Sequence, residues 1–201
     1  MNLIAESAAL LGEKLDRSGC EDGIVVIDVN PDAEHCPYER GACMEGAFGG
    51  RTAQFVTNSP IRAAPKVSDM VGAPLPNENE RAAACSVINA VAGFLCLSRR
   101  LKGCEKSNHP LCLAALTQEL TEKMVYCIGD LREIPTALGS RVVDTPEAAD
   151  LLLVSGDGMI SELGMALIDQ YRGKKEILLL TPSTAGVATM QKFPHWCPYG
   201  R

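Results

Sequence analysis

The C-terminal part of the chain alternates short apolar runs with stretches of helical character, and this alternation constrains the fold more than any other feature. Met124–Ile128, Leu151–Val154 and Glu176–Leu180 are each followed by a glycine-, serine- or proline-containing turn and then by a helix-forming stretch. Short apolar strands that alternate with helices are typical of a parallel sheet covered by helices on both faces. With Arg141–Asp144 as a further strand, the pattern predicts an α/β protein with a parallel sheet of about four strands.

The residues before this sheet have a different pattern, which predicts a smaller α+β unit. Met1–Asp16 has apolar residues at helical spacing, and Gly23–Val29 and Arg51–Thr57 have the composition of strands. The glycine-rich stretch between the two strands is expected to be a loop. Pro60–Pro76 contains four prolines and is interpreted as a connector.

Two helices are predicted between this connector and the sheet. Glu78–Leu101 is apolar nearly all round in its centre, which indicates a buried helix. Asn108–Lys123 has a proline near its first turn, where a missing N–H costs little. We therefore expect an enolase N-terminal-like α+β domain at 1–76 and a Rossmann-like ligand-binding domain at 77–201.

The composition excludes several classes of protein. The 201-residue chain has a net charge of −6 and 4% aromatic residues, and its only basic pairs are Arg99-Arg100 and Lys174-Lys175. Nucleic acid is therefore an unexpected partner. The N-terminus lacks the basic start and unbroken apolar stretch of a signal peptide, and no run is long enough to span a membrane. We expect a cytoplasmic protein without a membrane partner, and a homo-oligomer remains open.

The turns after the predicted parallel strands are candidates for a ligand site. Loops and helix N-termini collect at the carboxyl ends of parallel strands, and small residues with free N–H groups there favour an anion. Ordinary tight turns with an N-cap at Ser155 or Asp157 would give the same pattern. The candidate residues in these turns are Gly129, Asp130, Ser155, Gly156, Asp157, Gly158, Pro182, Ser183 and Thr184.

Nine cysteines in a cytosolic chain indicate thiols rather than disulfides. Cys85, Cys96 and Cys127 lie in apolar runs and are interpreted as small core residues. The informative cysteines lie in three groups, each near one of the three histidines: in a glycine-rich loop, between two helices and in the tail. Candidate metal ligands in these three groups are His35, Cys36 and Cys43, then Cys104, His109 and Cys112, then His195 and Cys197.

Thiolates and imidazoles suit zinc, copper(I), nickel or an iron–sulfur cluster, so a transition metal or such a cluster is a candidate cofactor. None of the spacings is a C-x-x-C pair, and reduced surface thiols that meet no metal would also explain each group. One segment echoes another: His35-Cys36-Pro37-Tyr38 is similar to His195-Trp196-Cys197-Pro198-Tyr199.

Common catalytic motifs are absent from the sequence. There is no P-loop, nucleophile elbow or His-Glu-x-x-His motif, and Gly156-Asp157-Gly158 is a lone G-x-G. An enzyme that acts on a nucleotide-like or SAM-like ligand, with Asp144 on a ribose, stays as an alternative hypothesis. Whether the chain catalyses a reaction is left open.

Several segments together resemble the heavy-metal chelation family. They are Asn79–Ala84 with Val87–Ala90, Ile128-Gly129, Ala149–Gly156 and Leu179–Thr184, so the resemblance runs from residue 78 to the C-terminus and more faintly through the strand at 23–29. It implies an enolase N-terminal-like domain, a Rossmann-like domain and a site between them. By that similarity Glu80, Arg81 and Asn89 would face the cleft from the helix, and Ser155, Gly156, Pro182, Ser183 and Thr184 would face it from the sheet.

Two features depart from that family. Asp157–Ile160 stands where a threonine-rich turn is expected, and the cysteine groups are not part of the family pattern. Without the resemblance, Glu78–Arg81 is a polar first turn on a buried helix, and Asn89 is a buried amide that must find partners.

Three functional hypotheses follow. The first is the binding or handling of a metal ion, or of an anionic metal-chelating cofactor such as a tetrapyrrole, in the inter-domain cleft. In it Arg81 and the helix start at Ser155–Gly158 hold the anionic groups, while Asp130, Asp157 or a cysteine reaches the metal. The second is the nucleotide- or SAM-dependent enzyme, and the third is a thiol-based redox or metal-sensing protein.

Overall fold

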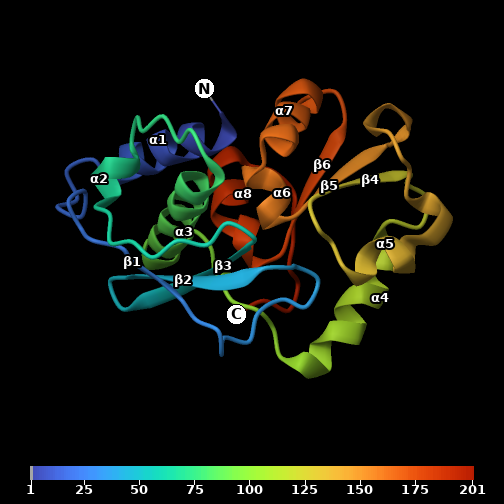
Figure 1. The fold of residues 1–201 in the computed structure, drawn as a ribbon, viewed down its shortest axis with the longest axis horizontal. Helices are drawn as coiled ribbons and strands as arrows, with labels where there is room; N and C mark the ends of the chain where they lie inside the picture. Colours follow the sequence, from blue (N-terminus) through green and yellow to red (C-terminus); the bar gives the residue numbers. More distant parts are fainter. Residues whose placement is uncertain (1) are drawn as a thin grey trace.

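The computed structural model describes residues 2–201 as two β-sheets that are joined and covered by helices (Figure 1). The predicted α/β class is confirmed. A three-stranded antiparallel sheet has the order β1 (Val26–Val29), β2 (Ala42–Phe48) and β3 (Arg51–Thr57). A four-stranded parallel sheet has the order β4 (Val125–Ile128), β5 (Leu151–Val154), β6 (Glu176–Leu180) and β7 (His195–Trp196).

The helices are of unequal length. The longer ones are α1 (Leu3–Leu15), α3 (Glu78–Phe94), α4 (His109–Glu119), α7 (Glu162–Tyr171) and α8 (Ala185–Gln191). The short ones are α2 (Val67–Met70), α5 (Glu133–Leu138), α6 (Gly156–Ile160) and the 3₁₀ turns η1 (Lys106–Asn108), η2 (Gly139–Arg141), η3 (Pro146–Ala148) and η4 (Pro182–Thr184). No helix within residues 2–201 is both long enough and apolar enough to cross a membrane.

The centre of the parallel sheet is buried on both faces because its strands are mostly apolar, and β5 is apolar at every position. Leu151 and Leu153 of β5 pack in one cluster with α4 and α5, whereas Leu152 and Val154 pack in the other cluster with α7 and α8. All four side chains are fully buried. Alternate residues of one strand therefore serve two cores, as expected for a sheet with helices on both sides.

The antiparallel sheet contains a strand that the sequence pattern does not reveal. We predicted a loop between residues 30 and 50, but β2 lies there and is the central strand. Gly46 obscures the strand pattern in the sequence. A Cβ atom at this position would lie 2.9 Å from the carbonyl oxygen of Ser86 in α3, so only a glycine lets α3 pack this closely on β2. Gly49 and Gly50, with φ of 53° and 76°, then make the turn into β3.

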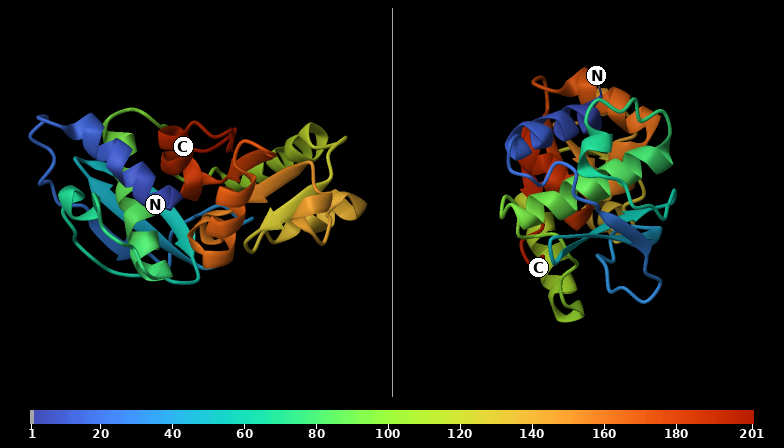
Figure 2. Two further views of the ribbon diagram at one scale, coloured as in Figure 1. Left: turned by 90° about the horizontal axis from the view of Figure 1, so that it is seen from above. Right: turned by 90° about the vertical axis from the view of Figure 1, so that its left-hand side faces the viewer.

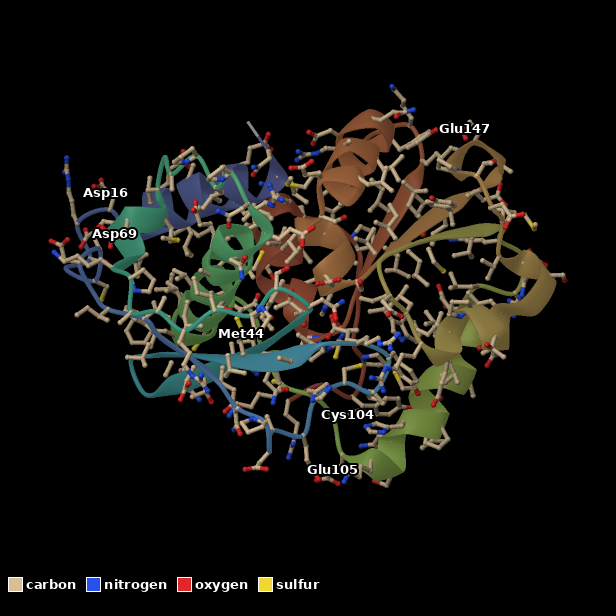
Figure 3. All side chains as sticks on the ribbon, in the orientation of Figure 1. Asp16, Met44, Asp69, Cys104, Glu105 and Glu147 are labelled. Carbon is tan, nitrogen blue, oxygen red and sulfur yellow. The ribbon has the colours of Figure 1, made fainter. Side chains whose placement is uncertain are left out.

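Helix α3 lies between the two halves of the molecule. It packs on β2 and β3 on one side and on α8 on the other, and Met44 of β2 is fully buried beneath it (Figure 3). The predicted boundary at residue 76 falls directly before this helix. Seen from above, the two sheets follow one another along the length of the molecule (Figure 2).

Helix α3 ends earlier than the predicted Leu101. It stops at Phe94, and Cys96 has φ of 56°, a left-handed conformation that ends the helix. Cys96 is therefore exposed rather than part of the core, which corrects the interpretation drawn from its apolar neighbours. The predicted helices at the N-terminus and at 108–123 correspond to α1 and α4.

Two elements of the C-terminal half differ from prediction. Arg141–Asp144 is not a strand, because η2 takes up its first residue and Val142 forms only an isolated bridge with Val125. The fourth strand is instead β7 in the tail. The helix expected after Ser155 is divided into α6 and α7 at Ser161, whose hydroxyl accepts a hydrogen bond from Gly164 N and caps α7.

Candidate functional site

The carboxyl ends of the parallel strands lie along one edge of the sheet, as predicted. In the strand register Ile128 lies beside Val154, which lies beside Leu179. The turns after β4, β5 and β6 therefore meet, and the backbone N–H of Ser155 donates to Ile128 O at 3.1 Å. An open parallel sheet usually binds its ligand at this edge.

The carboxylate of Glu39, from the loop before β2, fills this edge. Its Oε1 accepts a hydrogen bond from Gly156 N at 3.1 Å, and its Oε2 accepts one from Ser183 Oγ at 2.8 Å. The same hydroxyl oxygen accepts the N–H of Val56 in β3 at 2.9 Å. A Cβ atom on Gly156 would lie 2.5 Å from the Cβ of Ser183, so these groups are in close contact. The anion position predicted at the start of α6 is therefore occupied by the protein's own carboxylate.

Burial of Glu39 changes its titration. Its side chain is 2% exposed, and this burial raises its pKa to about 7, with a smaller contribution from Asp157. The hydroxyls of Thr181 and Ser183 and the N–H of Gly156 oppose the rise. Thr181 has φ of 72°, unusual for a β-branched residue, and its buried hydroxyl lies near the carboxyl without a hydrogen bond of regular geometry.

Asp157 and Gly129, both predicted to bind a ligand, are engaged within the protein. Asp157 accepts hydrogen bonds from Thr57 Oγ1 at 2.8 Å and from the backbone and side-chain nitrogens of Asn58 at 2.9 Å each. Gly129 has φ of 94°, and a Cβ atom there would lie 2.1 Å from Ser155 Oγ. Asp157 thus ties the end of β3 to α6, and Gly129 allows the first two turns to touch.

Asn89 finds the partners that a buried amide requires. Its Oδ1 accepts the N–H of Gly186 at 2.8 Å, and its Nδ2 donates to the carbonyls of Ser183 at 3.0 Å, Gln54 at 3.2 Å and Pro182 at 3.3 Å. The side chain is fully buried. It joins α3, β3 and the turn after β6, and its polar atoms are satisfied by backbone.

Glu80 and Arg81 do not meet the turns of the sheet. Arg81 is 4% exposed, and its Nη1 donates to the carbonyls of Pro76 at 3.3 Å and Leu75 at 3.4 Å. Glu80 is exposed at the start of α3, where it accepts a hydrogen bond from Asn77 Nδ2 at 2.9 Å. Both side chains therefore organise the entry into the helix.

Asp130 and Asp144 are placed at opposite ends of the sheet. Asp130 forms an exposed ion pair with Arg40 at 3.3 Å. Asp144 follows Val142, which bridges Val125 at the amino end of β4, so Asp144 is remote from the turns at the carboxyl ends. The remaining predicted residues of the edge, Gly158, Pro182 and Thr184, use their polar groups in hydrogen bonds within the protein.

Four cysteines from distant parts of the chain line one narrow pocket, which we call the thiol pocket. They are Cys36, Cys104, Cys112 and Cys197, and Tyr38, Trp196 and Tyr199 line the pocket with them. The three groups of cysteines that are separate in the sequence thus each contribute to one place, with Cys104 on the segment that leads to α4 (Figure 3). The free volume is about 20 Å³, which is room for about one water molecule.

Backbone contacts fix the walls of the thiol pocket. The Tyr38 hydroxyl donates to the carbonyl of His109, which ties the loop before β2 to the start of α4. A Cβ atom on Gly103 would lie 2.8 Å from the carbonyl carbon of His35, so the two segments pass in contact. Gly103 N also donates to Gln54 Oε1 at 2.7 Å. These contacts hold two of the cysteine-bearing segments against the antiparallel sheet.

The tail brings in the fourth cysteine through the parallel sheet. Thr181 N donates to Trp196 O at 3.1 Å, and this pairing extends the sheet by β7. Cys197 follows directly and is buried. Gly200 then packs over the thiol, because a Cβ atom there would lie 2.5 Å from Cys197 Sγ.

Burial keeps the four thiols protonated at neutral pH. It raises the pKa of Cys197 to about 12 and that of Cys36 well above its usual value, and it also raises the pKa of Cys104 and Cys112. The thiols also act on one another: Cys112 raises the pKa of Cys36, and both Cys104 and Cys112 raise that of Cys197. Arg201 opposes the rise at Cys104. The pocket therefore holds neutral thiols that lie within each other's electrostatic reach.

An unpaired donor faces one of these thiols. The indole N–H of Trp196 is buried without a hydrogen-bond partner. It lies beside the Cys112 thiol and lowers its pKa, against the larger effect of burial. A thiolate accepts a hydrogen bond more strongly than a thiol, so deprotonation of Cys112 would supply the missing partner.

The other four predicted metal ligands do not line the thiol pocket. His195 Nε2 is hydrogen-bonded with Thr181 O at 2.8 Å, and burial lowers the pKa of His195. Cys43 is buried in β2, and His109 Nε2 is buried without a partner. His35 Nδ1 lies 3.1 Å from Ala33 O. Within residues 2–201 no three histidine, cysteine or carboxylate side chains stand in positions that would hold a single metal ion.

The structure adds residues that the sequence did not single out. Glu39 was missed because an isolated glutamate in a loop carries no pattern. Tyr38, Trp196 and Tyr199 could have been found, since the similar segments His35–Tyr38 and His195–Tyr199 both supply a cysteine and an aromatic residue to the thiol pocket.

No family model matches the sequence, and no curated protein matches it. The chain is similar to a solved structure of a protein of unknown function from the DUF364 family of Pyrococcus horikoshii, with 15% identity, an alignment that covers 88% of this chain and 79% of that one, and a TM-score of 0.43. A similarity of this degree does not place the chain in that family.

Proposed function

We propose that the protein binds a thiophilic metal through Cys36, Cys104, Cys112 and Cys197. The observation that carries this proposal is that four cysteines line one small pocket, although the first and the last, Cys36 and Cys197, are 161 residues apart in the sequence. Four thiolates are a donor set for zinc and for iron–sulfur clusters. The metal is a single soft ion or a small cluster held by these thiolates.

The protonated state of the four thiols is compatible with a site that binds a cation. In the metal-free protein burial holds all four protonated. A divalent cation would stabilise their thiolate forms, so binding releases protons. The buried indole N–H of Trp196 beside Cys112 would then donate to a ligand sulfur, which is a common outer-shell interaction at metal sites. Because the sulfurs do not yet surround a single point, binding requires rotation of the cysteine side chains.

Two other hypotheses receive less support. A reactive redox thiol needs a lowered pKa and access to solvent, whereas these thiols have raised pKa values and line a narrow pocket. A nucleotide or SAM site at the sheet edge would need the groups that Glu39 already occupies. The metal hypothesis therefore moves from the sheet edge to the thiol pocket.

Metal analysis of the anaerobically purified chain tests the proposal. We expect one metal centre per chain after reconstitution with Zn²⁺ or with iron and sulfide, and visible absorption separates the two arms, because zinc thiolates are colourless. Serine at any of the four positions should lower the metal content at least tenfold, while Cys20→Ser and Cys96→Ser, which lie outside the pocket, should leave it unchanged. Circular dichroism checks that each variant is folded. A folded wild-type chain that takes up no metal, or equal losses in the two control variants, contradicts the proposal.

A further inference from the structure

A second pocket adjoins the segment that carries Cys104 and is lined by basic side chains. Arg51, Arg99, Lys102 and Arg201 surround a cavity of about 480 Å³. Leu101 and Lys102 line this cavity, and the next two residues, Gly103 and Cys104, line the thiol pocket. We call it the basic pocket, and we propose that it binds a small ligand with at least two oxyanion groups, such as phosphates or carboxylates.

The charged side chains that line the basic pocket are all cationic. Within residues 2–201 none of its four cationic side chains forms an ion pair, and no acidic side chain lines it. The chain as a whole has a net charge of −6, so the positive charge of this pocket is opposite in sign to that of the whole molecule. Unpaired cations around a concave site raise the local concentration of anions.

The end of α3 does not account for these cations. The helix stops at Phe94, and its carbonyl end carries about half a negative charge, which attracts basic residues. Backbone N–H groups of Leu95, Leu97 and Ser98 already donate to carbonyls of its last turns. Four positive charges exceed by several-fold what this dipole needs.

The walls of the basic pocket suit the head of a small anion. Gly50 has open space over its Cα, Gly93 packs against Leu101, and Thr52 and Ser98 add hydroxyl groups. The lining has no aromatic ring on which a base or sugar could stack. The volume lies within the usual range for small-molecule sites. Recognition would therefore depend on the charged oxygens of the ligand, with arginine forks as bidentate donors.

Arg201 is held in an orientation that leaves most of its donors available. Its backbone oxygen accepts the N–H groups of Leu101 and Lys102 at 2.8 and 2.7 Å, and its Nε donates to Gly103 O at 3.1 Å. The terminal nitrogens of the guanidinium remain for a ligand. The segment 101–103 thus holds the arginine, and its last residue, Gly103, also lines the thiol pocket.

Calorimetric titration of the full chain at constant ionic strength tests the proposal. Inorganic pyrophosphate and citrate represent the two oxyanion chemistries, and acetate is the singly charged control. We expect saturable binding of at least one of the first two and none of acetate. The double variant Arg51→Gln/Arg99→Gln should weaken binding about a hundredfold, tenfold for each lost charge-assisted contact. The matched variant Arg17→Gln/Arg62→Gln removes the same charge outside the pocket and should change binding less than twofold.

Cys96 provides a second readout, because it is exposed and lines the basic pocket. The ratio of the alkylation rate with anionic iodoacetate to that with neutral iodoacetamide should be higher at Cys96 than at Cys20, and pyrophosphate should remove that difference. Cys20, half-buried elsewhere, serves as the internal control in the same mass spectrum. Absence of saturable binding to pyrophosphate and citrate, or an equal loss in the Arg17/Arg62 variant, would overturn the proposal. Because no thiol-pocket residue is altered, these results do not depend on metal binding.

Discussion

The Glu39 carboxylate accepts a hydrogen bond from the Ser183 hydroxyl at 2.8 Å, and this contact joins the loop before β2 to the turn after β6. The pair is fully enclosed, and Ser183 also accepts the N–H of Val56. A segment of the first half of the chain thereby occupies the position at which a Rossmann-like sheet usually receives an anion. The edge is used for cohesion between the two halves, and the polar groups there are available to each other rather than to a ligand.

Replacement of Glu39 by glutamine should change how stability depends on pH. The folded pKa of Glu39, about 7, lies above its usual 4.5, so the carboxyl contributes most below pH 4.5 and its contribution is lost as pH rises to 7. The wild type should therefore lose about 3 kcal/mol relative to Glu39→Gln between pH 4.5 and 7. Urea unfolding of both proteins at several pH values measures this difference. A difference that is constant with pH would contradict the assigned titration.

Loss of the Asn89 amide should destabilise the protein strongly. Asn89→Ala leaves the Gly186 N–H and the carbonyls of Gln54 and Ser183 without this partner, which should lower the free energy of unfolding by about 3 kcal/mol. Ser86→Ala, one turn earlier on the same helix, removes a buried hydroxyl that has no partner and should be neutral or slightly stabilising. Chemical denaturation of the two variants makes the comparison. Similar losses in both would mean that packing, and not the hydrogen bonds, is decisive.

The thiols of the metal-free protein should react slowly. Because burial raises the pKa of Cys36, Cys112 and Cys197, little thiolate is present at pH 7.5, and iodoacetamide should modify these residues at least tenfold more slowly than exposed Cys96. Site-resolved mass spectrometry gives the individual rates. In urea the rates should converge, which serves as the control. Rapid native-state labelling of Cys197 would contradict the assigned burial.

Local patterns predicted much of the fold, and the failures have identifiable physical causes. The apolar runs of β4, β5 and β6 could be recognised from the sequence alone, because a strand buried on both faces is mostly apolar along its length. Strand β2 was missed because Gly46, which α3 needs for close approach, looks like a loop residue. Arg141–Asp144 has strand composition, but the chain turns at Gly139–Arg141 and leaves too little length for pairing.

The site was predicted less completely than the fold. The sequence pointed to the sheet edge and to the cysteine groups. It could not show that Glu39 fills the edge, since Glu39 and its partner Gly156 are 117 residues apart in the sequence. Nor could it show which cysteines meet, because the answer depends on the path of the segment 101–104 and of the tail. No pattern in the sequence separated Cys43 from Cys36. In the structure Cys43 is a buried residue of β2, where it is paired with Val56 of the antiparallel sheet.

Trp196 should tune the metal affinity of the thiol pocket through one hydrogen bond. Its buried N–H has no partner in the metal-free protein but lies beside Cys112, so it gains an acceptor only when that sulfur becomes a thiolate. Trp196→Phe should therefore weaken Zn²⁺ binding about tenfold in a competition titration with a chromophoric chelator. Tyr199→Phe alters another ring of the same pocket and should leave the affinity within twofold. If both variants weakened binding equally, the indole would act by shape alone, whereas a loss confined to Trp196→Phe identifies a donor that recognises the charged state of the ligand sulfur.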